Sequence, residues 1–217
     1  MKVVAVVPMK LNNQRLPNKN TKLFTNGRPL CSYILKTLKK VKSIDEIYVF
    51  CSDEKIKEYL PENIKYLKRN SDLDKDTTTM NEVLNEFIKE IDASIYVLAH
   101  ATAPFIKQSS FEKCINELKN GHYDSAFSAQ KVQEFLWKDG RPINYNLENI
   151  PRTQDLPIIY KETCGFYIFK KDILTKYNRR IGVNPYIYEV DEIEGTDIDN
   201  GFDFEIADYI VNKYEVE

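Results

Sequence analysis

Short apolar runs alternate with amphipathic segments over the first half of the chain. The run KVVAVVP at 2–8 is continuous and β-branched, which is typical of a strand buried on both faces of a parallel sheet. The segment 29–42 places apolar residues at helical spacing, and Ser109 with Ser110 predicts the N-terminal cap of a later helix. The same patterns predict strands at 46–51, 64–69 and 94–100, and helices at 53–60, 79–91 and 109–121. This β-α alternation predicts an α/β fold with a doubly wound, mostly parallel, Rossmann-like sheet, which binds ligands at the carboxyl ends of its strands.

The pattern changes after about residue 122. Strand-like runs at 123–132, 162–169 and 186–190 follow one another with little helix between them, and a helical segment comes last at 201–215. No internal repeat or low-complexity linker separates these runs from the first half. We therefore expect one domain over residues 1–217, with a β-rich insertion in the C-terminal half at about 123–190.

Charge and cysteine usage narrow the function classes. The 31 basic and 33 acidic residues nearly balance, which excludes the large basic surface of a protein that binds nucleic acid or a membrane. The four cysteines are scattered without a C-x-x-C pair, which favours reduced thiols over a zinc site. The apolar N-terminal run is too short for a secretion signal or a membrane span. We expect a cytoplasmic protein that contacts neither nucleic acid nor membrane, and any anion site must be local.

The loop after the first predicted strand carries three cations, Lys10, Arg15 and Lys19. In doubly wound folds this loop commonly binds phosphate. It contains no glycine before Gly27, which excludes both the G-x-G-x-x-G and the Walker A loops. Asparagine tolerates left-handed backbone angles and is available at Asn12, Asn13 and Asn20. The loop is either a local anion site or a solvated basic loop.

Asp197 and Asp199 form a carboxylate pair near the C-terminus. Side chains two positions apart in an extended segment point the same way, so both carboxylates would face one site. Such a pair is costly unless a cation neutralises it, and Mg²⁺ beside a nucleoside triphosphate is the usual cation. The competing interpretation is that the region around Asp199 and Asn200 caps the last helix while Asp197 lies on the surface.

Five motifs then occur in the order of one known family. The first loop reads RLPNKN and is followed by NGRPL; the others are KRNSDLDKDTTT at 68–79, ATAPF at 101–105, IPRTQDLP with YKETCGFYIF at 150–169, and EGTDIDNGFDFEIAD at 194–208. With these motifs the chain resembles the CMP-sialic acid synthetases (acylneuraminate cytidylyltransferases) and the related CMP-Kdo synthetases. The resemblance spans nearly the whole chain and implies a single cytidylyltransferase domain with a nucleotidyltransferase-like fold.

The resemblance also implies a reaction and its residues. CMP would pass from CTP to an acidic sugar of the sialic or nonulosonic type, with release of pyrophosphate, for surface glycan biosynthesis. Lys10, Arg15 and Lys19 would bind the triphosphate, and Asn20 and Arg69 the cytosine or nucleotide. Lys19 and Asp199 would be catalytic, with Mg²⁺ on Asp197 and Asp199. The residues implied on the acceptor side are His100, Thr102, Arg152, Gln154, Lys161 and Tyr167.

The family further implies a homodimer that forms through the β-rich insertion. The insertion is rich in aromatic residues, which would form either the subunit interface or the insertion's own core: Phe127, Phe135, Trp137 and Tyr145.

The chain departs from the family pattern mostly on the acceptor side. His100 stands where the family usually has glutamine, Ile106 where an arginine follows, and Lys161 where another arginine is usual. In the first loop Lys10, a point charge, replaces an arginine fork. No residue stands out as a general base. Three alternatives therefore stay open: another anionic acceptor such as a phosphonate or phosphate ester, a nucleotide-sugar glycosyltransferase, and a non-catalytic sugar-nucleotide binding protein.

Overall fold

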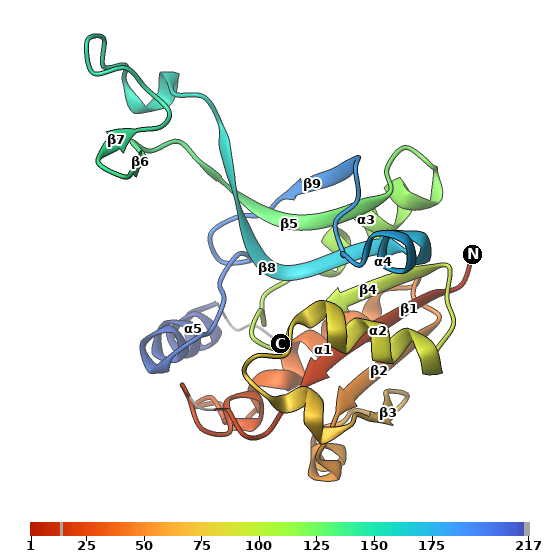
Figure 1. Cartoon of the computed structure of the whole chain (residues 1–217). Coiled ribbons are helices and arrows are strands. Elements are labelled where there is room, and N and C mark those ends of the chain that lie inside the picture. Colours follow the sequence, from red (N-terminus) through yellow and green to blue (C-terminus); the bar gives the residue numbers. More distant parts are fainter. Residues whose placement is uncertain (14, 215–217) are drawn as a thin grey trace.

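A seven-stranded sheet forms the centre of the protein, whose structure, a computed structural model, describes residues 1–13 and 15–214. The strands lie in the order β3-β2-β1-β4-β8-β5-β9 (Figure 1). Their bounds are β1 Val3–Met9, β2 Glu46–Cys51, β3 Lys65–Lys68, β4 Ile95–Ala99, β5 Ser125–Val132, β8 Ile159–Lys170 and β9 Pro185–Glu189. β1 pairs in parallel with β2 and β4, whereas β8 runs antiparallel to both β4 and β5. The mostly parallel α/β fold is therefore confirmed.

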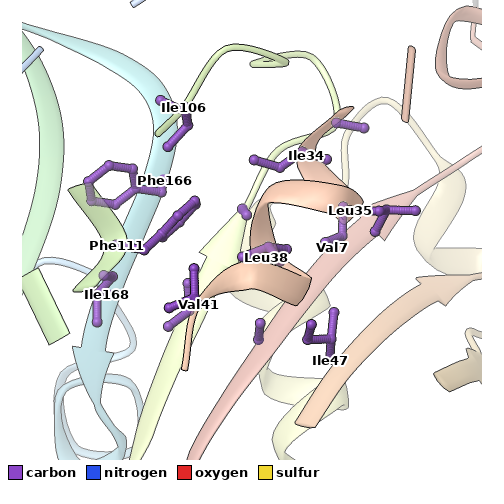
Figure 2. Close-up of a cluster of buried hydrophobic side chains, with 14 of the residues drawn as sticks. Val7, Ile34, Leu35, Leu38, Val41, Ile47, Ile106, Phe111, Phe166 and Ile168 are labelled. Carbon is purple, nitrogen blue, oxygen red and sulfur yellow. The ribbon is translucent and has the colours of Figure 1, made fainter. Parts of the chain in front are cut away.

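Helices cover both faces of the sheet and one end of it. They are α1 Leu30–Lys40, α2 Met80–Glu90, α3 Gln108–Lys119, α4 Lys171–Tyr177 and α5 Gly201–Lys213. On one face, Leu38 of α1 and Phe111 of α3 pack on Val7 and Phe166 of the sheet (Figure 2). α2 and α4 pack on the other face. The side chain of Leu38 is fully buried, so its truncation to alanine would cost about 2–5 kcal/mol.

Local sequence explains the boundaries of α2. Thr79 accepts a hydrogen bond from the backbone of Glu82, and the Glu82 carboxylate accepts one from the Thr79 backbone, which is a reciprocal cap. Val83, Leu84 and Phe87 follow at helical spacing and are buried. The helix therefore begins at a capped residue and turns its apolar stripe to the sheet.

Four elements of the structure differ from the sequence expectations. The predicted serine cap of α3 is wrong: the helix starts after Lys107, whose backbone N-H donates to Glu194, and Ser110 is buried inside the helix. A buried carboxylate from a distant segment therefore takes the place of the local cap. The predicted helix at 53–60 is a 3-10 helix, Glu54–Tyr59. α4 was not predicted, and the helix expected over 201–215 ends at Lys213, with residue 215 outside the described residues.

Most of the β-rich second half belongs to the central sheet. β5, β8 and β9 complete that sheet, and the segment at 133–158, which we call the arm, projects from it with a small hairpin of β6 Trp137–Lys138 and β7 Arg141–Pro142 (Figure 1). Phe127 lies in the sheet core, whereas the rings of Phe135 and Tyr145 pack together in the arm at 4.8 Å. Among the described residues, no helix is long and apolar enough to cross a membrane.

Candidate active site

A cleft of about 340 Å³ opens at the carboxyl ends of β1 and β4. Nine of the thirteen residues that the sequence singled out line it: Lys10, Arg15, Lys19, Asn20, Arg69, His100, Thr102, Asp197 and Asp199. They come from four separate segments of the chain. Two of these segments follow β1 and β4, one follows β3 and one precedes α5, and all four meet at one edge of the sheet. This is the edge where doubly wound folds bind ligands.

The first loop turns through a left-handed asparagine. Asn18 has φ 54° and begins the short 3-10 helix Lys19–Thr21. The sequence had suggested Asn12, Asn13 or Asn20 for such a conformation, and the structure assigns it to Asn18 instead. The turn buries Lys19, whose side chain is only 11% exposed.

Lys19 and Arg15 converge on the carboxylate of Asp199. The Nζ of Lys19 lies 3.7 Å from Asp199 Oδ1 and donates a 2.7 Å hydrogen bond to the backbone carbonyl of Ile198, while the Arg15 guanidinium lies 3.1 Å from the same carboxylate. Burial lowers the pKa of Lys19, and the charges of Asp199 and Asp197 oppose that shift. This part of the cleft therefore holds two cationic side chains that are already oriented to bind an anionic group.

Asp197 and Asp199 lie on either side of Ile198, which anchors the segment. Ile198 is fully buried, and its backbone N-H donates to the carbonyl of Thr102 at 2.9 Å. Burial raises the pKa of Asp197, and the charge of Asp199 adds to the rise. Asp197 Oδ1 is buried and has no hydrogen-bond partner among the described residues. Two carboxylates that face one cleft, one of them unsatisfied, suit an oxygen-binding cation.

The helix-cap interpretation is also fulfilled, but by neighbouring residues. The Asn200 side chain accepts from the backbone N-H groups of Phe202 and Asp203, and Asp203 accepts from those of Asp199 and Asn200. Capping of α5 therefore does not use the side-chain carboxylates of Asp197 and Asp199, both of which line the cleft.

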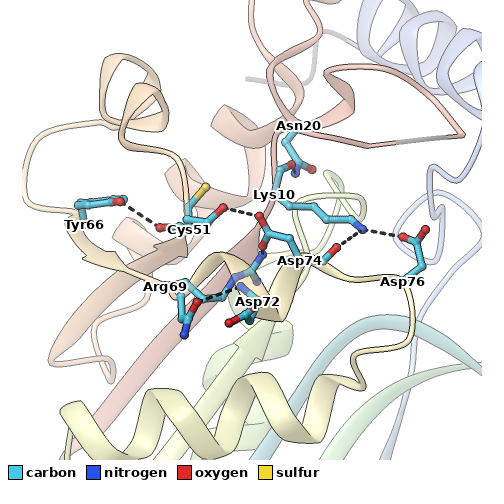
Figure 3. A network of polar contacts seen from close by, with 10 residues as sticks. Lys10, Asn20, Cys51, Tyr66, Arg69, Asp72, Asp74 and Asp76 are labelled. Carbon is cyan, nitrogen blue, oxygen red and sulfur yellow. Dashed lines mark hydrogen bonds and ion pairs between the residues drawn. The ribbon is translucent and has the colours of Figure 1, made fainter.

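On the opposite wall, acidic residues hold Arg69 and Lys10 (Figure 3). The Arg69 side chain is 4% exposed and forms an ion pair with Asp74. Lys10 Nζ donates to the Asp74 backbone carbonyl at 3.0 Å and to Asp76 at 2.9 Å. Asn20 Nδ2 donates to the Lys10 carbonyl at 2.9 Å. Asp74 and Asp76 were not among the residues predicted from the sequence, although they belong to the acid-rich run that follows Arg69.

The remaining end of the cleft is formed by His100, Thr102 and Cys164. Burial, with the nearby charges of Arg180 and Lys19, lowers the pKa of His100 to about 4. The imidazole is therefore neutral at physiological pH. Arg180 was not singled out from the sequence, because no motif or periodicity marks it.

Four predicted acceptor residues do not line the cleft. Tyr167 is buried beside it, and its hydroxyl donates to Glu162 at 2.6 Å. Lys161 lines a different depression, of about 940 Å³, between β5, β8 and β9. Arg152 and Gln154 lie exposed in the arm, where Arg152 pairs with Asp155. Within one subunit, the structure does not bring Arg152, Gln154 or Lys161 to the other site residues.

Comparisons with known proteins agree with this geometry. Residues 4–201 match the family described as cytidylyltransferase. The chain is 27% identical over 130 residues, 58% of its length, to 3-deoxy-manno-octulosonate cytidylyltransferase 2 of Hydrogenovibrio crunogenus. It is 23% identical over 99% of its length to a Helicobacter pylori protein named pseudaminic acid cytidylyltransferase and UDP-2,4-diacetamido-2,4,6-trideoxy-beta-L-altropyranose hydrolase. The matches cover 51% and 44% of these two relatives, so the chain spans about half the length of each.

Solved structures share the fold. A CMP-2-keto-3-deoxy-manno-octonic acid synthetase complexed with CTP superposes with a TM-score of 0.75 at 14% identity, over 99% of this chain and 100% of that one. The 4-diphosphocytidyl-2C-methyl-D-erythritol synthase of Anaerococcus prevotii superposes with a TM-score of 0.67 at 16% identity, over 98% and 96%. At such low identity these likenesses carry the fold alone. The family match over residues 4–201 shows that the chain belongs to the cytidylyltransferase family.

Proposed function

We propose that the protein transfers CMP from CTP to an acidic sugar of the nonulosonic type and releases pyrophosphate, in the cytoplasm, for surface glycan biosynthesis. The observation that carries the proposal is the convergence of Arg15 and Lys19 on Asp199 beside Asp197, at the end of the first strand. Nucleotidyl transfer needs cations for a triphosphate next to carboxylates for a metal ion. The names of the matched relatives, which act on 3-deoxy-manno-octulosonate and pseudaminic acid, support the acceptor class.

Asp197 and Asp199 are the residues that would hold Mg²⁺. The fit rests on the unsatisfied Oδ1 of Asp197 and on the pKa of its carboxyl, which burial and the charge of Asp199 raise. Mg²⁺ binds through one or two carboxylates and keeps positions for water and phosphate oxygens, which matches a pair of aspartates beside cationic side chains. Bound Mg²⁺ would offset the negative charge on the α-phosphate and on the leaving pyrophosphate.

The side chains of the protein position the reactants. Lys19 is fixed by the Ile198 carbonyl and presents its charge to the leaving phosphates, while Arg15, with a side chain 71% exposed, has room to close over them. The acceptor hydroxyl attacks the α-phosphorus in line, the bond to pyrophosphate breaks, and the hydroxyl proton passes to solvent. Positioning and charge stabilisation supply most of the barrier reduction in such a reaction. The neutral imidazole of His100 is available to hydrogen-bond the acceptor.

Arg69 and Asn20 would select cytosine. Both line the cleft, both are almost completely buried, and their side chains can donate to the carbonyl and ring-nitrogen acceptors of that base.

The test is pyrophosphate release with each of CTP, UTP, ATP and GTP in the presence of Mg²⁺. The acceptors offered are 3-deoxy-manno-octulosonate, pseudaminic acid, N-acetylneuraminic acid, phosphocholine and aminoethylphosphonate. We expect pyrophosphate with CTP and at least one of the sugar acids, and a CMP-sugar as the product. Activity only with a phosphate or phosphonate acceptor would overturn the acceptor class. Equal use of ATP would overturn the cytosine assignment, and no pyrophosphate with any pair would overturn the activity itself.

A further inference from the structure

Arg180 is a cation beside the cleft that no carboxylate neutralises. Among the described residues it forms no ion pair and its Nε is buried without a hydrogen-bond partner, while its remaining polar contacts are one of 3.5 Å from NH1 to Asn81 and one with the hydroxyl of Tyr167. Its guanidinium lies over the ring of Tyr167, with Cζ 4.2 Å from the ring centroid. Arginine donors that are buried and unsatisfied are costly, so such a group is expected to meet an anion.

The loop that carries Arg180 is held firmly in place. Asn178 ends α4 in a left-handed conformation with φ 51°. Its backbone carbonyl accepts from the Asn81 side chain at 2.8 Å, and its own side chain accepts from that of Asn85 at 2.6 Å. Both partners are on α2, whose first residue, Met80, lines the cleft. These contacts fix the loop against the helix that bounds the cleft, so Arg180 is a preorganised group.

Arg180 lies next to the part of the cleft that His100 and Cys164 line. Its positive charge contributes to the low pKa of His100, and His100 lines the cleft. It covers Tyr167, whose hydroxyl lies 3.6 Å from the sulfur of Cys164, a second residue of the lining. Arg15 and Lys19, the cations expected to bind the triphosphate, lie at Asp199. The part of the cleft lined by His100 and Cys164 is therefore where an acceptor would bind.

We propose that Arg180 binds the carboxylate of the acidic sugar and thereby determines the preference for an anionic acceptor. This inference rests on the proposed function and adds to it the residue that recognises the acceptor's charge. The cations expected there from the sequence, Arg152 and Lys161, lie outside the cleft of the same subunit. Arg180 does not line the cleft directly either, but it lies over Tyr167 beside that lining and its buried Nε lacks a partner. Arginine matches a carboxylate with two parallel hydrogen bonds.

The competing role for Arg180 is structural support of Tyr167 through the cation-π contact. The variants Arg180→Gln and Arg180→Lys separate the two roles, with Arg179→Gln as the matched control. Arg179 is the adjacent arginine, is exposed, and lies over another tyrosine, Tyr177, at 5.1 Å. Initial rates of pyrophosphate release give separate KM values for CTP and for the sugar acid. Each sugar acid is also offered as its primary amide, which lacks the charge.

We expect Arg180→Gln to raise the KM for the sugar acid about 10- to 100-fold, as for loss of a charge-assisted hydrogen-bonded pair, and to leave the KM for CTP within about twofold. The variant should also lose the preference for the acid over its amide. Arg180→Lys should show a smaller rise, since it keeps the charge without the fork, and it provides the same measurement if Arg180→Gln does not fold. Arg179→Gln should behave as the wild type.

The outcomes distinguish the inference from the function on which it rests. A wild-type protein that releases no pyrophosphate with any sugar acid overturns the proposed function, and the inference with it. An active wild type whose Arg180 variants keep both the KM for the acid and the preference over the amide overturns the inference alone. A fall in thermal stability together with a rise in the KM for CTP would assign Arg180 to structural support of Tyr167 and would also overturn the inference.

Discussion

The Nζ of Lys19 donates a 2.7 Å hydrogen bond to the backbone carbonyl of Ile198, across 179 positions of the chain. Ile198 is the fully buried residue between Asp197 and Asp199. One contact thus ties the cationic first loop to the segment that carries both carboxylates. Because the two groups are fixed relative to each other before any ligand binds, a nucleotide would meet a preorganised site.

The first prediction concerns Asp199. Asp199→Asn keeps the shape of the side chain but removes a charge that would hold Mg²⁺, so we expect turnover to fall by about 10²-fold or more while the fold is retained. Pyrophosphate release at saturating CTP measures the loss, and circular dichroism checks the fold. Glu205→Gln, an exposed acid on α5, is the control and should keep wild-type turnover. A near wild-type rate for Asp199→Asn at saturating Mg²⁺ would show that the metal assignment is wrong.

The second prediction concerns the buried ion pair of Arg69 and Asp74, whose side chains are 4% and 13% exposed. Arg69→Gln leaves the Asp74 carboxylate buried without its cation, so we expect the free energy of unfolding to fall by about 3 kcal/mol. The double variant Arg69→Gln with Asp74→Asn removes both charges and should recover most of that loss. Urea denaturation measures both values.

The same pair also tests the nucleotide role of Arg69. If Arg69 contacts CTP, the double variant should regain stability but not the thermal protection that CTP gives to the wild type. Full protection of the stable double variant by CTP would mean that Arg69 serves only the fold.

The elements that the sequence predicted correctly are those with a strong local pattern. The strand expected at 46–51 matches β2. Its continuous apolar run is typical of a strand that is buried on both faces of a sheet, and β2 is buried in this way. The short helix α4 was missed because it buries only Ile173 and Leu174, too few residues for a helical period. The antiparallel position of β8 inside the sheet depends on contacts between distant segments, which no local pattern records.

The site divides in the same way. The cations of the first loop were predictable, because a loop that follows the first buried strand always reaches the ligand edge of a doubly wound sheet. Arg180 was not predictable, since only the folded chain places the turn after α4 next to His100. Lys161 stays a predicted acceptor residue, although it lines a different depression from the cleft.

The third prediction is a pH effect from His100. Its pKa is lowered from 6.5 to about 4 by burial and by the charges of Arg180 and Lys19. As the pH falls from 6.5 towards 4, the unfolded chain takes up a proton that the folded protein refuses, so stability decreases over this window. At about 1.4 kcal/mol for each pKa unit, the loss approaches about 3 kcal/mol.

His100→Gln removes this titration, so the variant should lose less stability than the wild type between pH 6.5 and 4. Chemical denaturation at a series of pH values measures the free energy of unfolding of both proteins. Subtracting one curve from the other cancels the contribution of the carboxyl groups that both proteins share. Identical curves for the two proteins would contradict the assignment of a low pKa to His100.

The last prediction concerns the arm and the proposed homodimer. The arm exposes large apolar side chains, among them Trp137 at 54% and Ile150 at 61%, and exposed apolar surface of this kind commonly marks a subunit interface. We expect light scattering at micromolar concentration to report twice the mass of one chain. Each large apolar side chain that an interface buries contributes about 1.5–3 kcal/mol, so the double variant Trp137→Ser with Ile150→Ser should weaken the dimer by at least about 10²-fold and yield monomers. Val183→Ser, which changes an apolar side chain 76% exposed outside the arm, should leave the mass unchanged. A wild-type monomer at this concentration, or a double variant that dimerises as before, would show that the arm does not form the interface.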